Sequence, residues 1–464
     1  MSETTRIGVG LDFGTSNSTA AWFDGRELHH VRLEHGGPVS PTAVHLDRGY
    51  LSLTGSEAVT RYVEENRGRR VELVAEVIGE AATSISEGTS RTSELETKRR
   101  VVYGPLEDRG LPGRLFLGLK RLLGDPQLRR LRVFERHFRL VALVTPILLR
   151  IREQIEAQTG APVERLHAGR PVNFEGARHD ANATALARLT EAYGYAGFGA
   201  LQFYPEPVAA TLSYLWRARP PRDGVALTVD FGGGTLDLSL LRYAGQGFEV
   251  LATDGVGLGG DRIDQLIFAH CLFPLLGKGE SESRVVDGRR VDTLFPFEQF
   301  ESALLNWPIT HTLNQLRTKT LVAERLSKGG SGVEKFERLN DLITYNYSYN
   351  CFQAIRVAKA ALSQTEATII DIPELNLVIP FTRVQLDAIL SDALRMMEEL
   401  IDRLLTVARV ESRAVDIVIR TGGSSLIVAV GALLERRFPG KVVEHDPFTS
   451  VAGGLAIANY HGYT

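Results

Sequence analysis

Two segments of the chain place an acid at the end of an apolar run and follow it with small residues. Residues 8–25 read GVGLDFGTSNSTAAWFDG, and residues 225–241 read VALTVDFGGGTLDLSLL. A polyphosphate with a divalent cation needs backbone N–H groups lining a concavity, hydroxyls for phosphate oxygens and carboxylates for the metal or its waters. Asp12 and Asp230 with their small-residue turns supply that set twice. The repeat therefore predicts two similar lobes that each contribute one hairpin to a phosphate site.

Taken alone, a single turn of this kind is as often an ordinary tight hairpin. Asp24-Gly25 is such a hairpin signal, between the runs STAAWF and ELHHVRL. A third glycine turn, Gly422-Gly423, follows the apolar run DIVIRT. Two matched copies and this third turn together favour phosphate binding over the plain hairpin.

Composition limits the classes of partner. The chain has 464 residues and a net charge of −3, so we expect about three units and neither a nucleic acid nor a membrane as a partner. Its two cysteines, Cys271 and Cys351, form no CxxC pair, which argues against a cysteine-built metal site. The N-terminus lacks a leader pattern and no apolar run is long enough to span a bilayer, so we expect a cytoplasmic protein.

The elements that position these turns are predicted from periodicity and breakers. Strands joined by tight turns fill the first forty residues, and a charged, helical pattern follows over 46–136. Later elements are a helix over 133–158 with Pro146 as a candidate kink, a buried strand within 164–174, a helix over 176–195, a linker over 217–224, a largely helical region over 258–373, a helix near 382–408, and a strand, glycine turn and helix from 416.

Four motifs resemble those of the actin-like ATPase superfamily, in particular the nucleotide-binding domain of the seventy-kilodalton heat-shock chaperones of the DnaK type. GLDFGTSNS and VDFGGGTLDLSLL are similar to the two phosphate loops of that family, YPEPVAATLSY to its first connecting segment, and IVIRTGGSS to its adenosine loop. The resemblance covers nearly the whole chain and is closest to the YegD-like branch. It implies an α/β, two-lobe actin-like (ribonuclease H-like) fold, each lobe a mixed five-stranded sheet flanked by helices, with subdomain insertions.

The resemblance also implies domain boundaries. Lobe I takes residues 1–220, with a core of about 1–45 and 137–220 and an insertion of about 46–136. Lobe II takes residues 221–443, with a core of about 221–257 and 374–443 and a helical subdomain of about 258–373. Residues 444–464 return to lobe I, and the helical subdomain is a candidate surface for a protein partner.

The implied ligands are ATP or ADP, Mg²⁺ and, as a monovalent cation, K⁺. The implied catalytic residues are Lys120, Glu206, Asp12, Asp230 and Thr235. Asp12, Asp230 and Asp237 are implied to hold the metal, mostly through water. The implied nucleotide contacts are Gly14, Thr15, Ser16, Asn17, Gly232, Gly233, Gly234, Gly259, Gly260, Lys359, Ser363, Gly422, Gly423 and Ser424.

Several of these residues have ordinary alternatives. Lys120 and Lys359 taken alone are typical of solvated helix faces, and Glu206 is typical of an acid at a helix N-terminus. Arg356, Ala360, Leu426 and Phe448 stand where the family pattern has other residues, all on its adenosine side. We therefore expect intact phosphate chemistry and altered recognition of the base.

The function that follows is Mg²⁺-dependent ATP hydrolysis by a chaperone-like molecular switch. Residue types supply reasons for it, because phosphoryl transfer needs positioning and charge neutralisation above all. Two rivals remain open: a small-molecule, sugar-type kinase of the same superfamily, and a nucleotide sensor or scaffold that does not hydrolyse ATP. We identify no segment that resembles the family's peptide-binding domain, so we expect no client-binding groove.

Overall fold

The computed structural model describes residues 6–84, 97–174, 181–218, 223–244, 247–286, 289–330 and 332–463. The chain forms two compact units. Unit 1 comprises Met1–Glu64, Gly113–Leu272 and Asn350–Thr464, and unit 2 comprises Glu65–Pro112 and Phe273–Tyr349.

The first sheet of unit 1 has the strand order β13-β12-β1-β2-β3. Its strands are β1 (Gly8–Phe13), β2 (Asn17–Phe23), β3 (Leu28–His30), β12 (Arg165–Arg170) and β13 (Ala200–Pro205), and β4 (Ser40–Pro41) pairs with β2 beside this path. The first three strands form an antiparallel meander, while β12 and β13 run parallel to β1.

The second sheet of unit 1 repeats this plan with the order β16-β15-β14-β21-β22. Its strands are β14 (Asp223–Phe231), β15 (Leu236–Ala244), β16 (Gly247–Val256), β21 (Ile417–Thr421) and β22 (Val442–Glu444). Again three antiparallel strands come first, followed by two that are parallel to the first of them. The matching topologies confirm the predicted α/β fold with two similar lobes, and β4 adds a sixth strand to the first sheet.

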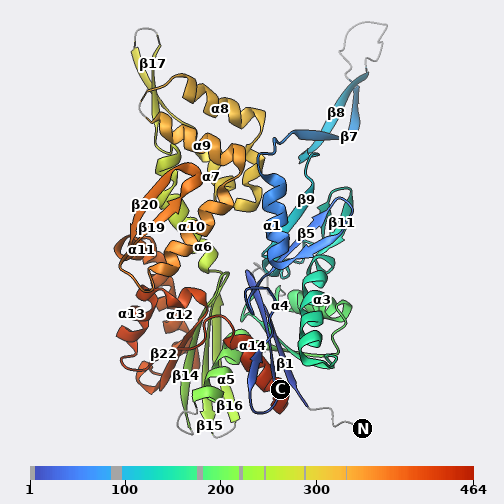
Figure 1. Cartoon of the computed structure of the whole chain (residues 1–464), viewed down its shortest axis with the longest axis vertical. Helices are drawn as coiled ribbons and strands as arrows, with labels where there is room; N and C mark the ends of the chain where they lie inside the picture. Colours follow the sequence, from blue (N-terminus) through green and yellow to red (C-terminus); the bar gives the residue numbers. More distant parts are fainter. Residues whose placement is uncertain are drawn as a thin grey trace. The chain divides into compact units, whose positions relative to one another are not determined.

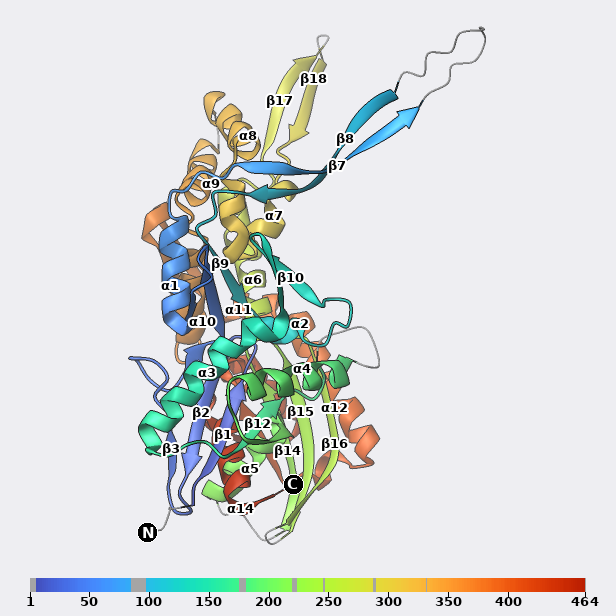
Figure 2. The ribbon, with the colours of Figure 1, turned by 90° about the vertical axis from the view of Figure 1, so that its right-hand side faces the viewer.

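The core of the first sheet depends on close approach of a helix. β1 is buried along nearly its whole length, and α14 (Ser450–His461) packs against both β1 and α5 (Glu206–Ala218) (Figures 1 and 2). A Cβ at Gly10 would lie 2.3 Å from the Ala452 carbonyl oxygen, and one at Gly454 would lie 1.7 Å from the Ala209 carbonyl oxygen. The small residues of α14 therefore set its distance from the strand that carries Asp12.

Further helices flank the sheets of unit 1. α3 packs on α4, and α12 packs on β15 and β16. The remaining elements of this unit are β5 (Ala43–Asp47), β6 (Ser52–Thr54), α1 (Gly55–Asn66), β9 (Gly113–Leu117), α2 (Leu119–Leu122), β10 (Arg130–Val133), β11 (Arg136–Arg139), α3 (Leu140–Thr159), α4 (Ala181–Tyr195), α6 (Gly260–Cys271), α10 (Ser348–Ala361), β19 (Ala367–Ile372), η3 (Pro373–Leu375), β20 (Leu377–Thr382), α11 (Arg383–Ile389), α12 (Ser391–Ala408), η4 (Ser412–Ala414), η5 (Gly423–Leu426) and α13 (Val428–Arg437).

Unit 2 is made of two inserted segments that bond to each other. It contains two antiparallel hairpins, β7 with β8 and β17 with β18 (Figure 2). Its elements are β7 (Leu73–Ser84), β8 (Thr97–Asp108), η1 (Phe273–Leu276), β17 (Ser281–Val286), β18 (Arg289–Leu294), α7 (Glu298–Leu304), η2 (Trp307–Leu313), α8 (Leu316–Ser327) and α9 (Val333–Tyr345). Arg69 forms an ion pair with Asp108, and the Asn314 side chain donates to the Arg69 carbonyl at 2.8 Å.

The prediction of a helical region over 46–136 is wrong for most of its length. Apart from α1 and the four-residue α2, the regular elements in the described part of this region are strands β5 to β11, which pair as antiparallel hairpins and, for β5 with β9, across the region. The region 258–373 is mainly helical but also holds β17, β18 and β19. The helix with Pro146 begins at Leu140, since residues 133–139 lie in or beside the β10–β11 hairpin.

Some expectations fall partly outside the described residues: residues 85–96 of the region 46–136, the start of the helix predicted from 176, and residues 219–222 of the linker predicted over 217–224. Among the described residues, no helix combines the length and apolarity needed to cross a membrane.

Candidate active site

The two predicted phosphate hairpins face each other in unit 1. The first turn joins β1 to β2, and the second joins β14 to β15 and is closed by a hydrogen bond from the Gly232 N–H to the Thr235 carbonyl at 3.0 Å. A Cβ at Gly233 would lie 2.5 Å from Ser16 Oγ, and one at Gly234 would lie 2.7 Å from Thr15 Cβ. Glycine is therefore required by close approach of the two turns rather than by an unusual backbone angle.

The two acids occupy matching places in the two sheets. Asp12 pairs with Thr19 across the first hairpin, and Asp230 pairs with Asp237 across the second. On the parallel side, a Cβ at Gly169 would lie 3.4 Å from Asp12 Oδ1. Gly422 adopts a left-handed φ of 81°, and a Cβ there would lie 2.7 Å from Asp230 Oδ1. A glycine thus lies beside each carboxylate, where a side chain would crowd Glu206 at position 169 and Asp230 at position 422.

Lys120 and Glu206 meet beside these acids. Lys120, on α2, is 3% exposed, and Glu206, the first residue of α5, is 8% exposed. The Lys120 ammonium donates a hydrogen bond to Glu206 Oε1 and forms an ion pair with it. Burial alone would lower the pKa of Lys120, but Glu206, Asp12 and Asp237 outweigh burial and raise this pKa. The lysine is therefore a fixed cation among carboxylates.

The buried acids hold more negative charge than this lysine balances. Burial and the Glu206 carboxylate raise the pKa of Asp12 to about 7, against the opposing effect of Lys120. Burial and Glu206 likewise raise the pKa of Asp237 to about 7, although hydrogen bonds from the Thr235 hydroxyl and the Val172 N–H oppose the rise. The pKa of Asp230 is raised well above its ordinary value, first by burial and then by its acidic neighbours.

The charge and chemistry of these residues suit a divalent cation held through its waters, while no group of three or more acids, histidines or cysteines among the described residues is arranged to hold a metal ion directly. Asp12 Oδ1 is buried and has no hydrogen-bond partner within the described part of the chain. Carboxylate oxygens are the ligands that Mg²⁺ prefers, and a second cation would relieve the repulsion that raises the pKa values of Asp12, Asp230 and Asp237. The turns that follow Asp12 and Asp230 carry the hydroxyls and N–H groups that an anion attached to that cation would need.

The other predicted glycines brace the second hairpin. The N–H groups of Gly260 and Asp261 donate to the carbonyls of Gly232 and Gly233 at 3.0 and 2.9 Å. Ser424 Oγ donates to the Gly232 carbonyl at 3.0 Å, and a Cβ at Gly259 would lie 2.3 Å from the Gly233 carbonyl oxygen. The start of α6 and the turn at Gly422-Gly423 therefore support Gly232–Gly234. In the first hairpin, Asn17 is the first residue of β2, and a Cβ at Gly14 would lie 2.2 Å from the Asn17 carbonyl oxygen.

Two of the predicted adenosine contacts, Lys359 and Ser363, bond to other groups of the protein. The Lys359 ammonium forms an ion pair with the buried carboxylate of Asp264 and donates to the Gly260 carbonyl at 3.4 Å. Ser363 Oγ donates to the Ala360 carbonyl of its own helix end at 2.6 Å. The exposed ring of Phe448 is 3.0 Å from where a Cβ of Gly423 would lie. The structure therefore gathers the phosphate side of the predicted set, while Lys359 and Ser363 hold protein groups, and their contact with a nucleotide stays a prediction.

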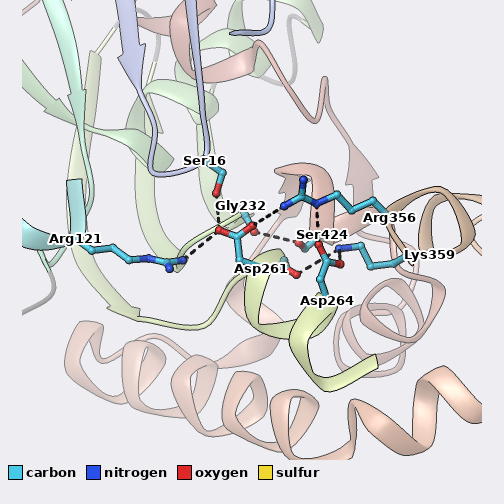
Figure 3. Close-up of polar contacts among 9 residues, drawn as sticks. Ser16, Arg121, Gly232, Asp261, Asp264, Arg356, Lys359 and Ser424 are labelled. Atoms are coloured by element: carbon cyan, nitrogen blue, oxygen red, sulfur yellow. Dashed lines mark hydrogen bonds and ion pairs between the residues drawn. The ribbon is translucent and has the colours of Figure 1, made fainter. Parts of the chain in front are cut away.

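Three residues of this site were missing from the sequence prediction. Asp261 and Asp264 lie on α6 directly after Gly259-Gly260, and Arg121 follows Lys120 on α2. Ser16, Arg121 and Arg356 all contact Asp261 (Figure 3). The sequence offered one indication of them, because they lie next to predicted residues in the segments GLKRLLG and GLGGDRID. Nothing in the local pattern indicates that these two segments contact each other.

Comparison with known proteins agrees with this geometry. Residues 124–280 match the family model described as Hsp70 protein. This segment contains Glu206, Asp230 and Asp237, whereas Asp12 and Lys120 lie before it. The chain is similar to a chaperone protein HscA homolog of Burkholderia thailandensis, with 31% identity over 268 residues, and to those of Burkholderia mallei and Burkholderia pseudomallei, each with 30% identity over 268 residues.

In each of these three comparisons the aligned region is 58% of this chain and 37% of the relative, so the chain covers little more than a third of the relatives' length. The matched family model, the relatives and the repeated sheet topology together support the Hsp70 and actin-like ATPase superfamily for this chain.

Proposed function

We propose that this protein binds Mg²⁺ and ATP between its two hairpins and hydrolyses the γ-phosphate, as a chaperone-like molecular switch. The observation that carries the proposal is the cluster of Asp12, Asp230, Asp237 and Glu206 around Lys120, at the place where Thr15 and Ser16 meet Gly233 and Gly234. A kinase would need a pocket for its substrate hydroxyl beside this cluster, and no observation here favours one.

Each residue has a role that its position supports. Asp12, Asp230 and Asp237 would hold Mg²⁺, mostly through its waters, and the metal would supply charge neutralisation on the phosphates. The turn residues Thr15 and Gly232–Gly234 would orient the phosphates through hydroxyl and N–H groups. Lys120 would stabilise the charge that develops on the transferred group, and Glu206 would orient the attacking water or accept its proton.

We also propose a monovalent cation, a place within the superfamily, a protein partner and a cellular compartment. Asp237 is a candidate for K⁺ as well as for Mg²⁺, and the YegD-like branch is the proposed place within the superfamily. The proposed lobes keep the predicted boundaries, with a protein partner on the 258–373 subdomain. The unpaired thiols of Cys271 and Cys351 are consistent with a reducing compartment, for which we propose the cytoplasm.

Phosphate release from Mg-ATP tests the proposal. Purified protein should release phosphate in the presence of Mg²⁺, and chelation of the metal should abolish this release. Lys120→Ala should lower the turnover by about 10²–10³-fold, the scale of one electrostatic donor. Equal release by the wild type and Lys120→Ala would contradict hydrolysis, whereas tight ATP binding without turnover would favour the sensor or scaffold.

A further inference from the structure

Asp261 joins parts of the site that belong to different sheets. Its Oδ2 accepts a hydrogen bond from Ser16 Oγ at 2.8 Å and lies 3.4 Å from Arg121 Nη2 (Figure 3). Its Oδ1 lies 3.7 Å from Arg356 Nη2. Ser16 belongs to the first hairpin, Arg121 to α2 and Arg356 to α10, so a single carboxylate contacts three separate segments.

The backbone of Asp261 is fixed to the second hairpin. Its N–H donates to the Gly233 carbonyl at 2.9 Å, and the preceding N–H, of Gly260, donates to Gly232. Asp261 also lies in the first turn of α6, where the helix dipole favours a negative side chain. The side chain therefore extends from a firmly held backbone across to the first hairpin.

The Arg121 contact reaches the candidate catalytic lysine. α2 is only four residues long, and Arg121 follows Lys120 within it. A bond from Asp261 to Arg121 therefore restrains the short helix that carries Lys120. An isolated ion pair whose side chains are 35% and 32% exposed would contribute little, but this carboxylate has three partners and a fixed backbone.

We infer that Asp261 is a positioning residue that holds the first hairpin and α2 against the second hairpin, and thereby slows the release of bound nucleotide. This inference rests on the proposed function. The carboxylate touches no reacting atom in this role. It acts through its contacts with Ser16 and Arg121. These contacts keep the first hairpin and α2 close enough to Gly232–Gly234 for one phosphate chain to contact both hairpins.

The first test measures dissociation of fluorescent ADP by stopped flow. Asp261→Asn, which keeps the size of the side chain and removes its charge, should release ADP about tenfold faster, equivalent to about 1.4 kcal/mol. Asp261→Glu should restore part of the slow release. Asp254→Asn is the matched control, because Asp254 of β16 is paired with Arg403 of α12, which packs on that strand, and the variant should leave release within twofold of the wild type.

A double-mutant cycle separates this role from general destabilisation. Arg121→Gln and Asp261→Asn should each speed release, and the double variant should be no faster than the faster single variant, because both remove the same contact. Additive effects, or release by Asp261→Asn within twofold of the wild type, would overturn the inference.

Hydrogen exchange of the nucleotide-free protein keeps the two proposals distinguishable. In Asp261→Asn the amides of residues 14–17 and 119–122 should exchange faster than in the wild type, while those of β14 should not change. Unchanged exchange in both segments would refute the positioning role even if nucleotide binds normally. Failure of the wild type to bind ADP would instead overturn the proposed function, together with the effect on release.

Discussion

The Lys120 ammonium is ion-paired with the Glu206 carboxylate, although the two residues lie 86 positions apart and both are nearly fully buried. The pair joins the short helix α2 to the N-terminus of α5. A buried charge that loses its partner is expensive, since it keeps its desolvation cost without the compensating attraction. The pair is therefore both a stability element and the centre of the proposed chemistry.

The first prediction separates these two contributions. Lys120→Met should lower the free energy of unfolding by about 3 kcal/mol, because Glu206 stays buried without its cation. The double variant Lys120→Met, Glu206→Gln should be more stable than Lys120→Met alone, while both should lack turnover. Denaturant unfolding of the four proteins in the cycle measures this, and a double variant less stable than Lys120→Met would contradict it.

A second prediction concerns the excess of negative charge among the buried carboxylates around Lys120. Because the pKa of Asp237 is raised to about 7 in the folded protein, the folded state binds a proton that the unfolded state has released. The nucleotide-free protein should therefore lose stability as pH rises from about 4 to about 7. Asp237→Asn, which can still accept from the Val172 N–H, should raise stability at pH 8 on the order of 2 kcal/mol.

Thermal unfolding at several pH values checks this prediction. The gain from Asp237→Asn should grow between pH 4 and pH 7 and stay constant above. Asp416→Asn is a suitable control, because Asp416 also accepts a backbone N–H, from Val225 at 2.7 Å, but lies outside the acidic cluster. A gain equal at pH 4.5 and pH 8 would rule out the charge as its cause.

The phosphate side of the site was predictable because its signal is local. A strand, an acid and a small-residue turn occur together within a dozen residues, and the same order occurs again around Asp230. The two sheets accordingly share one topology. What the sequence did not indicate is why Gly233 and Gly234 are needed: the facing turn approaches their Cα atoms too closely for a side chain.

The base side was harder to predict because its contacts join distant segments. The contact of Lys359 with a nucleotide stays a prediction, and its ion pair with Asp264, 95 residues away, is a contact that the sequence did not indicate. No periodicity encodes such a pairing. Strands β5 to β11 were missed because charged segments such as TKRR at the start of β8 also resemble an exposed helix when the strand pairing is unknown.

A third prediction concerns His311 in unit 2. Burial and the neighbouring Arg69 lower the pKa of His311 to about 4, while Asp108 and the Pro308 carbonyl oppose this. As pH falls, the unfolded state therefore binds a proton at this histidine before the folded state does. The contribution of His311 to the free energy of unfolding is complete above about pH 6.5 and is lost as pH falls towards 4. His311→Gln should reduce the pH dependence of unfolding over this range by about 1 kcal/mol per pH unit.

Urea unfolding at pH 7.5, 6.0 and 5.0 measures that slope. His137→Gln, at an exposed position of β11, is the control and should keep the slope of the wild type. If His311→Gln shows the same slope as the wild type, the histidine is not held neutral by its surroundings.

The last prediction concerns Arg188 of α4, which donates to the carbonyls of Leu122, Leu123, Asp125 and Leu128 at 3.4, 2.8, 2.9 and 2.9 Å. One guanidinium thus holds the end of α2 and the loop after it, and a lysine cannot reproduce this fork. Arg188→Lys should lower turnover about tenfold with little change in KM, because Lys120 is displaced. Glu191→Ala, on the same helix, should keep normal turnover. Arg188→Lys should add nothing to Lys120→Ala, and a further loss in that double variant would show that Arg188 acts elsewhere.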